Sequence, residues 1–312
     1  MVIKKLISIC IPCYNEEENV IPAYQVIIKN TTSLKRLNFE FIFVDNGSQD
    51  KTREKILQIA KKDKRVKGIF LSRNFGPESS GQAAFDHVTG DAVIGIPADM
   101  QEPPEMIPKL IKKWEEGYDL VLGVYRDTAD NFLMKVIRRI FYRILKEMTY
   151  VDIPIDSTGF GIFNRRVLDA LKTLKERHRF ARGLLAWVGF KRAFIPYVRR
   201  KRTRGKSSYN IFEYIRHAEK GIFGFSYLLL DVMVYLGFFL VFLSFLFIAG
   251  YLFTVIYFGN PINASIPLML VIVFFGGVQL LAISIIGKYI QVIVEETKAR
   301  PAYIIKDTVN IF

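Results

Sequence analysis

Cysteine, histidine and tryptophan are scarce in this chain of 312 residues, which has two cysteines, three histidines and two tryptophans. Cys10 and Cys13 form a C-x-x-C pair with no second pair, and the histidines show no ligand spacing, so the sequence offers no zinc site. A redox role would need a helix N-terminus, but the pair lies across a predicted strand end. We interpret both cysteines as small residues that pack near that strand.

Several sequence signatures are also missing. The chain has no G-x-G-x-x-G and no P-loop, so neither a dinucleotide-binding fold nor an NTPase is supported. It has no internal repeat and no RNA-binding signature. The first residues, Met1–Lys5, are not followed by a long apolar segment that would resemble a secretion signal, so we expect no cleavable signal peptide.

Acidic residues are outnumbered, 30 against 44 lysines and arginines, which gives a formal net charge of +14. Nucleic acid, an anionic membrane surface and phosphorylated substrates would all suit this excess. The basic residues cluster at Lys135–Lys146, at Arg199–Lys206 and at Arg216 and Lys220, near apolar spans or on amphipathic segments. Their placement favours a membrane and phosphate groups as partners and predicts no nucleic acid partner.

The longest uncharged stretch runs from Val232 to Gly287. Two apolar segments, 232–258 and 266–290, cover this stretch apart from a short turn, and a helix of ~20 residues is enough to cross a bilayer core. Lysine and arginine flank both segments on the side away from the short turn between them. The positive-inside rule therefore predicts a multi-pass protein of the cell (inner or plasma) membrane, with both termini and the preceding domain in the cytoplasm.

Before these spans, short apolar runs alternate with segments of helical periodicity. The predicted strands are Leu6–Pro12, Phe39–Val44, Val66–Leu71, Ala92–Ile96 and Leu120–Val124, and the predicted helices are Glu17–Thr31, Thr52–Asp63 and Pro104–Gly117. This alternation predicts an α/β domain with a mostly parallel sheet covered on both faces. Ligands of such sheets bind at the carboxyl ends of the strands.

Two amphipathic segments carry basic residues opposite an apolar face. Leu133–Met148 suits either a membrane surface or an ordinary core-facing helix, whereas the segment around Ile211–Ile222 leads directly into the first span. We therefore predict a catalytic domain at 1–206, an interfacial helix at 207–231, the two transmembrane helices within 232–291 and a cytoplasmic tail at 292–312.

A series of motifs lies at the predicted strand ends. In order they are Ile11–Glu17, Val44–Asp50, Ser72–Gly76 and Asp99–Glu105, followed by Arg179–Gly183, Trp187–Phe190, Arg202–Tyr209 and Gly287–Pro301. This ordered set resembles family 2 of the glycosyltransferases, which have the GT-A (Rossmann-like) fold. The closest resemblance is to the polyprenyl-phosphate glycosyltransferases, and it covers essentially the whole chain.

The resemblance implies a site for a nucleotide-sugar donor. Its residues would be Pro12, Tyr14, Glu16, Asp45, Arg73 and Gln101. Pro12, Tyr14 and Glu16 would form a shelf for base and ribose, although Tyr14 would also suit a packed core. Asp45 would accept hydrogen bonds from uracil or ribose, although an aspartate before glycine also suits a turn.

The resemblance further implies a divalent cation, Mg²⁺ or Mn²⁺, that neutralises the charge of the leaving diphosphate. Related enzymes carry a D-x-D motif and a nearby glutamine, and this chain has Pro97-Ala98-Asp99-Met100-Gln101. Proline thus replaces the first carboxylate, and Asp99 and Gln101 remain as metal ligands, with Asp99 a catalytic residue. Glu102 would compensate for the lost carboxylate or simply begin a helix.

The acceptor side is implied by Asp156 and by basic residues. Asp156 resembles a family residue near the reacting sugar, where it would orient the sugar or acceptor, remove a proton, or serve only a turn. Arg126, Arg200, Arg202, Lys206 and Ser207 would bind the phosphate of the lipid acceptor. The alternative is that the segment Arg199–Lys206 only contacts anionic headgroups.

These observations predict an inverting glycosyltransferase that moves a sugar from a nucleotide-sugar, UDP-linked in our interpretation, to undecaprenyl or another polyprenyl phosphate. The alternatives are a family 2 enzyme with another lipid or saccharide acceptor, and a catalytically weak nucleotide-sugar-binding membrane scaffold. The sequence does not specify the sugar or the downstream pathway. It leaves a homo-oligomer open, since Gly276 and Gly277 lie in an apolar hairpin.

Overall fold

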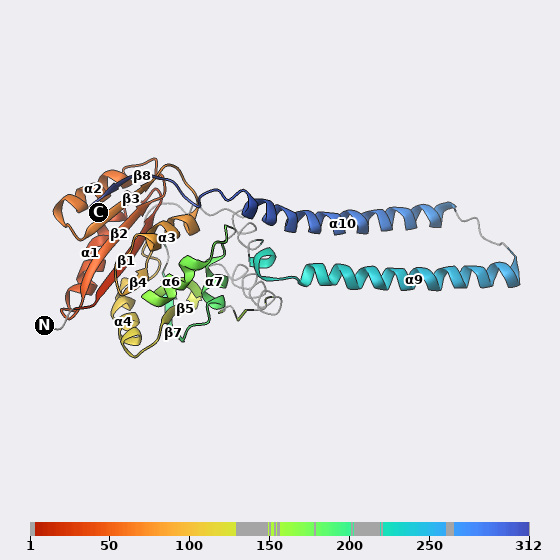
Figure 1. The fold of residues 1–312 in the computed structure, drawn as a ribbon, viewed down its shortest axis with the longest axis horizontal. Helices are drawn as coiled ribbons and strands as arrows, with labels where there is room; N and C mark the ends of the chain where they lie inside the picture. The colour runs from red at the N-terminus through yellow and green to blue at the C-terminus, as the bar shows by residue number, and fades with distance from the viewer. Residues whose placement is uncertain are drawn as a thin grey trace.

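The computed structural model describes residues 4–128, 149, 151–152, 154, 157–177, 179–200, 202, 219, 221–259 and 265–311. In this part of the chain an α/β domain carries two long helices, which lie side by side and extend away from it (Figure 1). The last strand returns from the second long helix to the domain. The predicted combination of an α/β domain and a helical hairpin is confirmed.

The domain contains one mixed sheet of eight strands in the order β7-β5-β6-β4-β1-β2-β3-β8. The strands are β1 Leu6–Cys13, β2 Asn38–Asp45, β3 Val66–Leu71, β4 Ala92–Gly95, β5 Leu120–Thr128, β6 Ser157–Asn164, β7 Arg192–Arg199 and β8 Ile305–Val309. The central strands β4, β1, β2 and β3 are parallel. Strand β6 runs antiparallel between β4 and β5, and β8 runs antiparallel to β3. The sheet is therefore mixed rather than mostly parallel.

Helices cover both faces of this sheet. They are α1 Val20–Thr32, α2 Thr52–Lys62, α3 Pro77–Asp86, η1 Pro104–Met106, α4 Ile107–Glu115, α6 Arg165–Thr173 and α7 Ala181–Trp187. Alternate residues of β1 point to opposite faces, so Ile9 packs in the core beneath α1, α2 and α4, and Cys10 packs in the core beneath α3, α6 and α7. Burial on both faces explains why the central strands are apolar almost throughout.

The strand order changes direction at β1. The chain proceeds from β1 to β2 and β3 on one side and then places β4 on the other side of β1. The loops that leave the carboxyl ends of β1 and β4 therefore diverge, which is where open α/β sheets leave room for a ligand.

A buried polar network fastens the opposite, amino-terminal end of the sheet. Glu40 of β2 accepts hydrogen bonds from the Ser8 hydroxyl, from Lys67 Nζ at 2.7 Å and from the backbone and hydroxyl of Thr89. Burial by itself would raise the pKa of Glu40, but these donors outweigh it and hold the pKa below its ordinary value. Because its partners satisfy the carboxylate, this network has a structural role.

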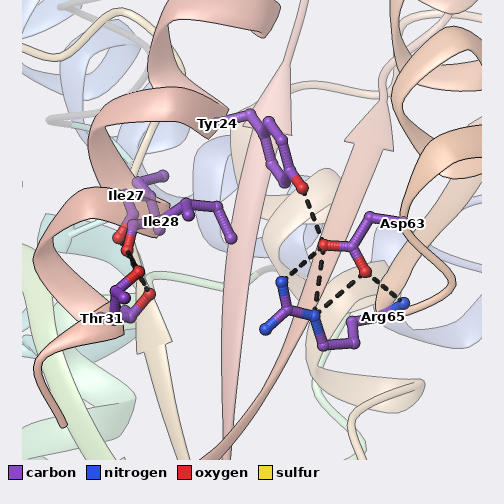
Figure 2. A network of polar contacts seen from close by, with 7 residues as sticks. Tyr24, Ile27, Ile28, Thr31, Asp63 and Arg65 are labelled. Carbon is purple, nitrogen blue, oxygen red and sulfur yellow. Dashed lines mark hydrogen bonds and ion pairs between the residues drawn. The ribbon is translucent and has the colours of Figure 1, made fainter.

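A second network joins α1 to the end of α2. Figure 2 shows the Tyr24 hydroxyl and the Arg65 guanidinium both directed at the Asp63 carboxylate, with Tyr24 Oη 2.7 Å from Asp63 Oδ2. The hydrogen bonds from Arg65 lower the pKa of Asp63 to about 2. The carboxylate therefore stays ionised to low pH.

The two long helices are α9, Leu228–Phe258, and α10, Ser265–Thr297. Both are long and apolar enough to cross a membrane, by length and composition. Their large apolar side chains are exposed, for example Phe238 at 71% and Phe242 at 62%, so they are not core helices of the domain. Exposed apolar surface of this extent is characteristic of a lipid or protein contact.

The hairpin is attached to the domain at both ends. Before α9, the buried Phe225 ring packs against Phe180 of the domain, with 6.0 Å between ring centroids. After α10, strand β8 pairs with β3, and Asn310 donates hydrogen bonds to the Ala60 and Val66 carbonyl oxygens. The sequence analysis predicted no such strand within the tail at 292–312.

Candidate active site

The loops after β1 and β2 are joined by reciprocal hydrogen bonds. The backbone amide of Asn15 donates to Ser48 Oγ at 2.9 Å, and the backbone amide of Gln49 donates to Asn15 Oδ1 at 2.9 Å. The Glu16 amide donates to Thr52 Oγ1 at 2.7 Å. Asn15 has a φ of 53°, a left-handed conformation that asparagine tolerates better than most residues. These contacts build a fixed rim along the carboxyl edge of the sheet.

Asp45 and Asn46 connect this rim to the loop after β3. Asp45 is buried and accepts a hydrogen bond from the Ser48 amide at 3.0 Å, so the turn role considered for it is realised. Burial raises the pKa of Asp45, with Ser48 opposing. The buried Asn46 amide group donates to Asn74 Oδ1 and accepts from the Phe75 amide. Asn46 is a positioning residue that the sequence analysis did not single out.

Asp99 follows β4 in a loop that lies against the end of β1. The Ala98 amide donates to the Pro12 carbonyl at 3.4 Å, and the Gln101 amide donates to Asp99 Oδ1 at 3.2 Å. Between them Met100 adopts a φ of 54°, which is uncommon for an unbranched apolar side chain. Backbone strain of this kind clusters at functional sites, and here it places Asp99 at the switch point of the sheet.

Three arginines at and after the end of β7 cross this edge; we call Arg199, Arg200 and Arg202 the arginine strap. Arg199 Nη2 donates to Gln101 Oε1 at 2.9 Å, and the Arg200 amide donates to the Gln101 carbonyl at 3.0 Å. The Arg200 side chain pairs with Glu105 at 3.2 Å and is largely exposed. The strap thus runs beside the Asp99–Gln101 loop.

Arg202 extends the arginine strap to the loop after β1, where it contacts Glu16. Its Nη2 lies 2.5 Å from Glu16 Oε1, and Asn19 Nδ2 donates to Glu16 Oε2 at 2.6 Å. Burial raises the pKa of Glu16, while Asn19 and Arg202 lower it and the nearby Asp99 raises it further. The negative charge of Asp99 therefore opposes the ionisation of Glu16.

Glu102 lies beneath the strap and is 2% exposed. Its Oε1 is 3.3 Å from Arg199 Nε, and its Oε2 has no hydrogen-bond partner in the described part of the chain. Burial raises the pKa of Glu102 to about 7, against the lowering effect of Arg199 and the further raising effect of Asp99. Glu102 therefore supports Arg199 from below rather than facing solvent.

The structure brings together many of the residues expected at the site. Gathered on one edge are Pro12, Tyr14, Glu16, Asp45, Asp99, Gln101, Arg200 and Arg202. Arg73 follows β3 and is exposed, with its guanidinium 4.1 Å above the Phe75 ring. Arg126 lies in β5, and Asp156, Lys206 and Ser207 lie outside the described residues. The donor and acceptor roles of all these residues stay predictions.

Arg199 is the member of the strap that the sequence analysis did not propose as a site residue. The signal was its place at the start of the basic cluster Arg199–Lys206. Its contacts depend on the pairing of β7 with β5, which no local pattern in the sequence revealed.

The described part of this edge offers one side chain, Asp99, that suits a divalent cation. Within the described residues no three acidic, histidine or cysteine side chains are grouped to hold a metal. Asp99 offers a half-buried carboxylate, and Mg²⁺ readily completes its shell with phosphate oxygens and water. Gln101 fits less well, since its oxygen is engaged by the positively charged Arg199. Its predicted role as a ligand would require its side chain to leave Arg199.

Residues 8–172 match the Glycosyl transferase family 2 domain, a range that includes every strand-end loop from Pro12 to Gln101. The chain belongs to glycosyltransferase family 2. Its sheet, with the parallel centre and antiparallel β6, is the GT-A-like arrangement expected from the sequence.

Relatives of this family 2 glycosyltransferase match it over nearly its full length. It is 38% identical to the bactoprenol glucosyl transferase of Shigella phage SfX over 301 residues, 96% of this chain and 98% of the relative. It is also 38% identical to an uncharacterised glycosyltransferase of Synechocystis over 302 residues, 96% and 95% of the two chains. A solved structure of a mannosyltransferase from Pyrobaculum calidifontis, in complex with GDP-Man and Mn²⁺, covers 70% of this chain and 62% of its own, at 18% identity and a TM-score of 0.46.

Proposed function

We propose that this glycosyltransferase moves a sugar from a UDP-linked donor to undecaprenyl or another polyprenyl phosphate at the cytoplasmic leaflet of the cell membrane. The observation that carries the proposal is the contact between the arginine strap and the Glu16 and Gln101 loops. This contact supports the proposal because the cationic side chains that we assign to the acceptor phosphate would then lie beside the edge that we assign to the donor. The near full-length similarity to a bactoprenol glucosyl transferase supports a polyprenyl acceptor.

The donor would lie along the rim made by the loops after β1, β2 and β4. Pro12, Tyr14, Glu16 and Asp45 would hold the nucleoside. Asp99 would hold Mg²⁺ or Mn²⁺ together with the donor's phosphate oxygens, and the cation would neutralise charge on the leaving diphosphate when bound. The strap arginines are the planar, permanently charged groups that suit phosphate oxygens.

The acceptor supplies its own nucleophile. A phosphomonoester has a second pKa of about 6, so a lipid monophosphate is largely deprotonated at neutral pH and needs little help from a general base. Arg202, with Arg200, Arg126, Lys206 and Ser207, would orient the phosphate behind the anomeric carbon. Attack from the face opposite the nucleotide inverts the configuration, and UDP leaves. Asp156 would orient the sugar or the acceptor.

The hairpin would bring this chemistry to the acceptor. Helices α9 and α10 would span the bilayer, with the domain and both termini on the cytoplasmic side, as the flanking lysines and arginines predict. An impermeant thiol reagent tests the orientation, because Cys10 and Cys13 are buried and react little. We expect labelling of Asn263→Cys and protection of Lys306→Cys in intact cells. The reverse pattern would refute the orientation.

The reaction is tested with detergent-purified protein, undecaprenyl phosphate, Mn²⁺ and a panel of UDP-sugars. We expect acceptor-dependent release of UDP and formation of a lipid-linked sugar with one donor. Release without the lipid acceptor, or transfer to a saccharide or diacylglycerol, would refute the polyprenyl proposal in favour of another acceptor. Donor binding with no turnover would favour the scaffold alternative.

A further inference from the structure

The arginine strap contains one residue whose position the proposed reaction has not yet used. Arg199 is the last residue of β7, and its side chain is 30% exposed. A guanidinium has five N–H donors in a fixed plane. Arg199 Nη2 donates a hydrogen bond to Gln101 Oε1, whereas Nε forms an ion pair with Glu102 Oε1 at 3.3 Å without a hydrogen bond.

The charges around Arg199 are arranged in two layers. The lower layer is the buried Glu102 carboxylate, which faces Arg199 and lies near Asp99 and Arg182. The upper layer is the partly exposed guanidinium itself, which donates to the Gln101 side chain in the loop that carries Asp99. A buried carboxylate below a partly exposed arginine fixes the direction of the arginine without removing it from the surface.

Among the described residues, the other two arginines of the strap already pair with carboxylates. Arg202 is paired with Glu16, Arg200 is paired with Glu105, and Pro97 stands where the family resemblance implies a metal-binding carboxylate. A cation held by Asp99 alone among the protein side chains would be bound weakly. The leaving diphosphate would therefore gain from a further positive charge, and Arg199 is the strap arginine whose guanidinium donates to the Gln101 side chain.

We propose that Arg199 binds the diphosphate of the donor, and that Glu102 is the positioning residue that aims it. This inference rests on the proposed function, because it assumes a nucleoside diphosphate donor at this edge. Arg199 exchanges its hydrogen bond to Gln101 for one to a phosphate oxygen while Glu102 continues to hold Nε. No covalent step is added, and Arg199 stays charged throughout.

The test compares UDP with uridine, which lacks the phosphates, by calorimetry in EDTA and again in Mn²⁺. We expect Arg199→Gln to weaken UDP binding in EDTA by about tenfold or more, since a hydrogen bond to a charged group is worth roughly 1.5–3 kcal/mol. Uridine binding should stay within about twofold of wild type. Arg199→Lys keeps the charge but loses the planar guanidinium, so its affinity for UDP should lie between those of wild type and Arg199→Gln. Equal UDP binding by wild type and Arg199→Gln would overturn the proposal.

Arg192→Gln is the matched control, because Arg192 lies at the other end of β7 and pairs with Asp152 at 3.1 Å. It should bind UDP as wild type does. A loss as large as that of Arg199→Gln would show a general effect of charge on β7 and overturn the proposal. Equal melting temperatures of the variants establish that each is folded. If Arg199→Gln does not fold, Arg199→Lys takes its place in the comparison with wild type.

A double-mutant cycle tests the role of Glu102. Glu102→Ala should weaken UDP binding although Glu102 touches no ligand, whereas Glu102→Gln, which keeps an oxygen near Arg199 Nε, should recover most of it. In the double variant, Glu102→Ala should add almost nothing to Arg199→Gln. Additive losses would refute the positioning role. Wild-type protein that binds UDP in this manner but transfers no sugar would refute the proposed function and leave this inference standing.

Discussion

Arg202 and Glu16 are 186 positions apart in the chain, and their side chains meet at 2.5 Å between Nη2 and Oε1. Glu16 belongs to the loop after β1, and Arg202 follows the edge strand β7. The pair therefore ties the centre of the sheet to its edge across the switch point. It also joins a residue predicted for the donor to one predicted for the acceptor.

The first prediction concerns this ion pair. Arg202→Ala should lower the free energy of unfolding of the domain by about 1–3 kcal/mol, because Glu16 would keep a buried charge without its main cation. The loss should stay below that of a fully buried pair because Arg202 is 17% exposed and Asn19 still donates to Glu16. Urea unfolding measures it. Adding Glu16→Gln to Arg202→Ala should restore part of the stability; a further loss would contradict the paired-charge explanation.

The second prediction concerns Asp99. Asp99→Asn keeps the shape and removes the only carboxylate that we assign to the cation, so UDP release with undecaprenyl phosphate should fall by about 100-fold or more, within the range for removal of one electrostatic stabiliser. Raising Mn²⁺ should recover little of it. Glu105→Gln is the control, because it removes a carboxylate from the same edge, the exposed partner of Arg200, and should leave most of the activity. Full activity in Asp99→Asn would remove the cation from this position.

The third prediction is a pH dependence of stability at Asp63. Hydrogen bonds from Arg65 lower its pKa to about 2, so its contribution to stability is fully present above the unfolded pKa of about 3.9 and is lost as the pH falls through 2. Wild type should therefore lose stability between about pH 4 and pH 2 more steeply than Asp63→Asn. Thermal unfolding of both proteins across this interval tests it, and parallel curves would contradict it.

The fourth prediction compares two glycines within helices. A Cβ on Gly183 of α7 would lie 2.5 Å from the buried Phe225 ring, whereas a Cβ on Gly81 of α3 would meet nothing within 4 Å. Gly183→Ala should destabilise the junction with α9 by about 1–3 kcal/mol through overpacking. Gly81→Ala should be neutral or stabilising by up to ~1 kcal/mol. Chemical unfolding measures both, and equal effects would show that Phe225 readily moves.

Local patterns in the sequence were sufficient to predict the central strands. Val66–Leu71 was predicted with the observed bounds because it is apolar and buried almost throughout. Strand β6 was not predicted, since Gly159 and Gly161 interrupt its apolar pattern. Gly161 is required because a Cβ there would lie 2.2 Å from the Val121 carbonyl of the neighbouring strand. Strand β7 contains Pro196, which suits an edge strand but weakens a pattern-based prediction.

The site divides in the same way. The position of Asp45 and Asp99 at this edge could be predicted from the sequence because each comes after a predicted strand, and position at a strand end is a local property. The contacts of Arg199 with Gln101 and of Arg202 with Glu16 depend on which strand lies at the edge of the sheet, and this is a tertiary property. Strand β8 is missed for a related reason, since Lys306 and Asp307 make it too polar to be recognised outside the sheet.

The two attachments of the hairpin have a mechanical consequence. A domain that is joined to a helical hairpin by a single linker can rotate freely, so its carboxyl edge samples many orientations. Here Phe225 fastens the chain before α9, and β8 fastens it again after α10, on the opposite side of the sheet order from β7. Two separated attachments remove the free swivelling that a single linker allows and leave rotation only about the line that joins them. The attachments therefore restrict how far the carboxyl edge can turn relative to α9 and α10.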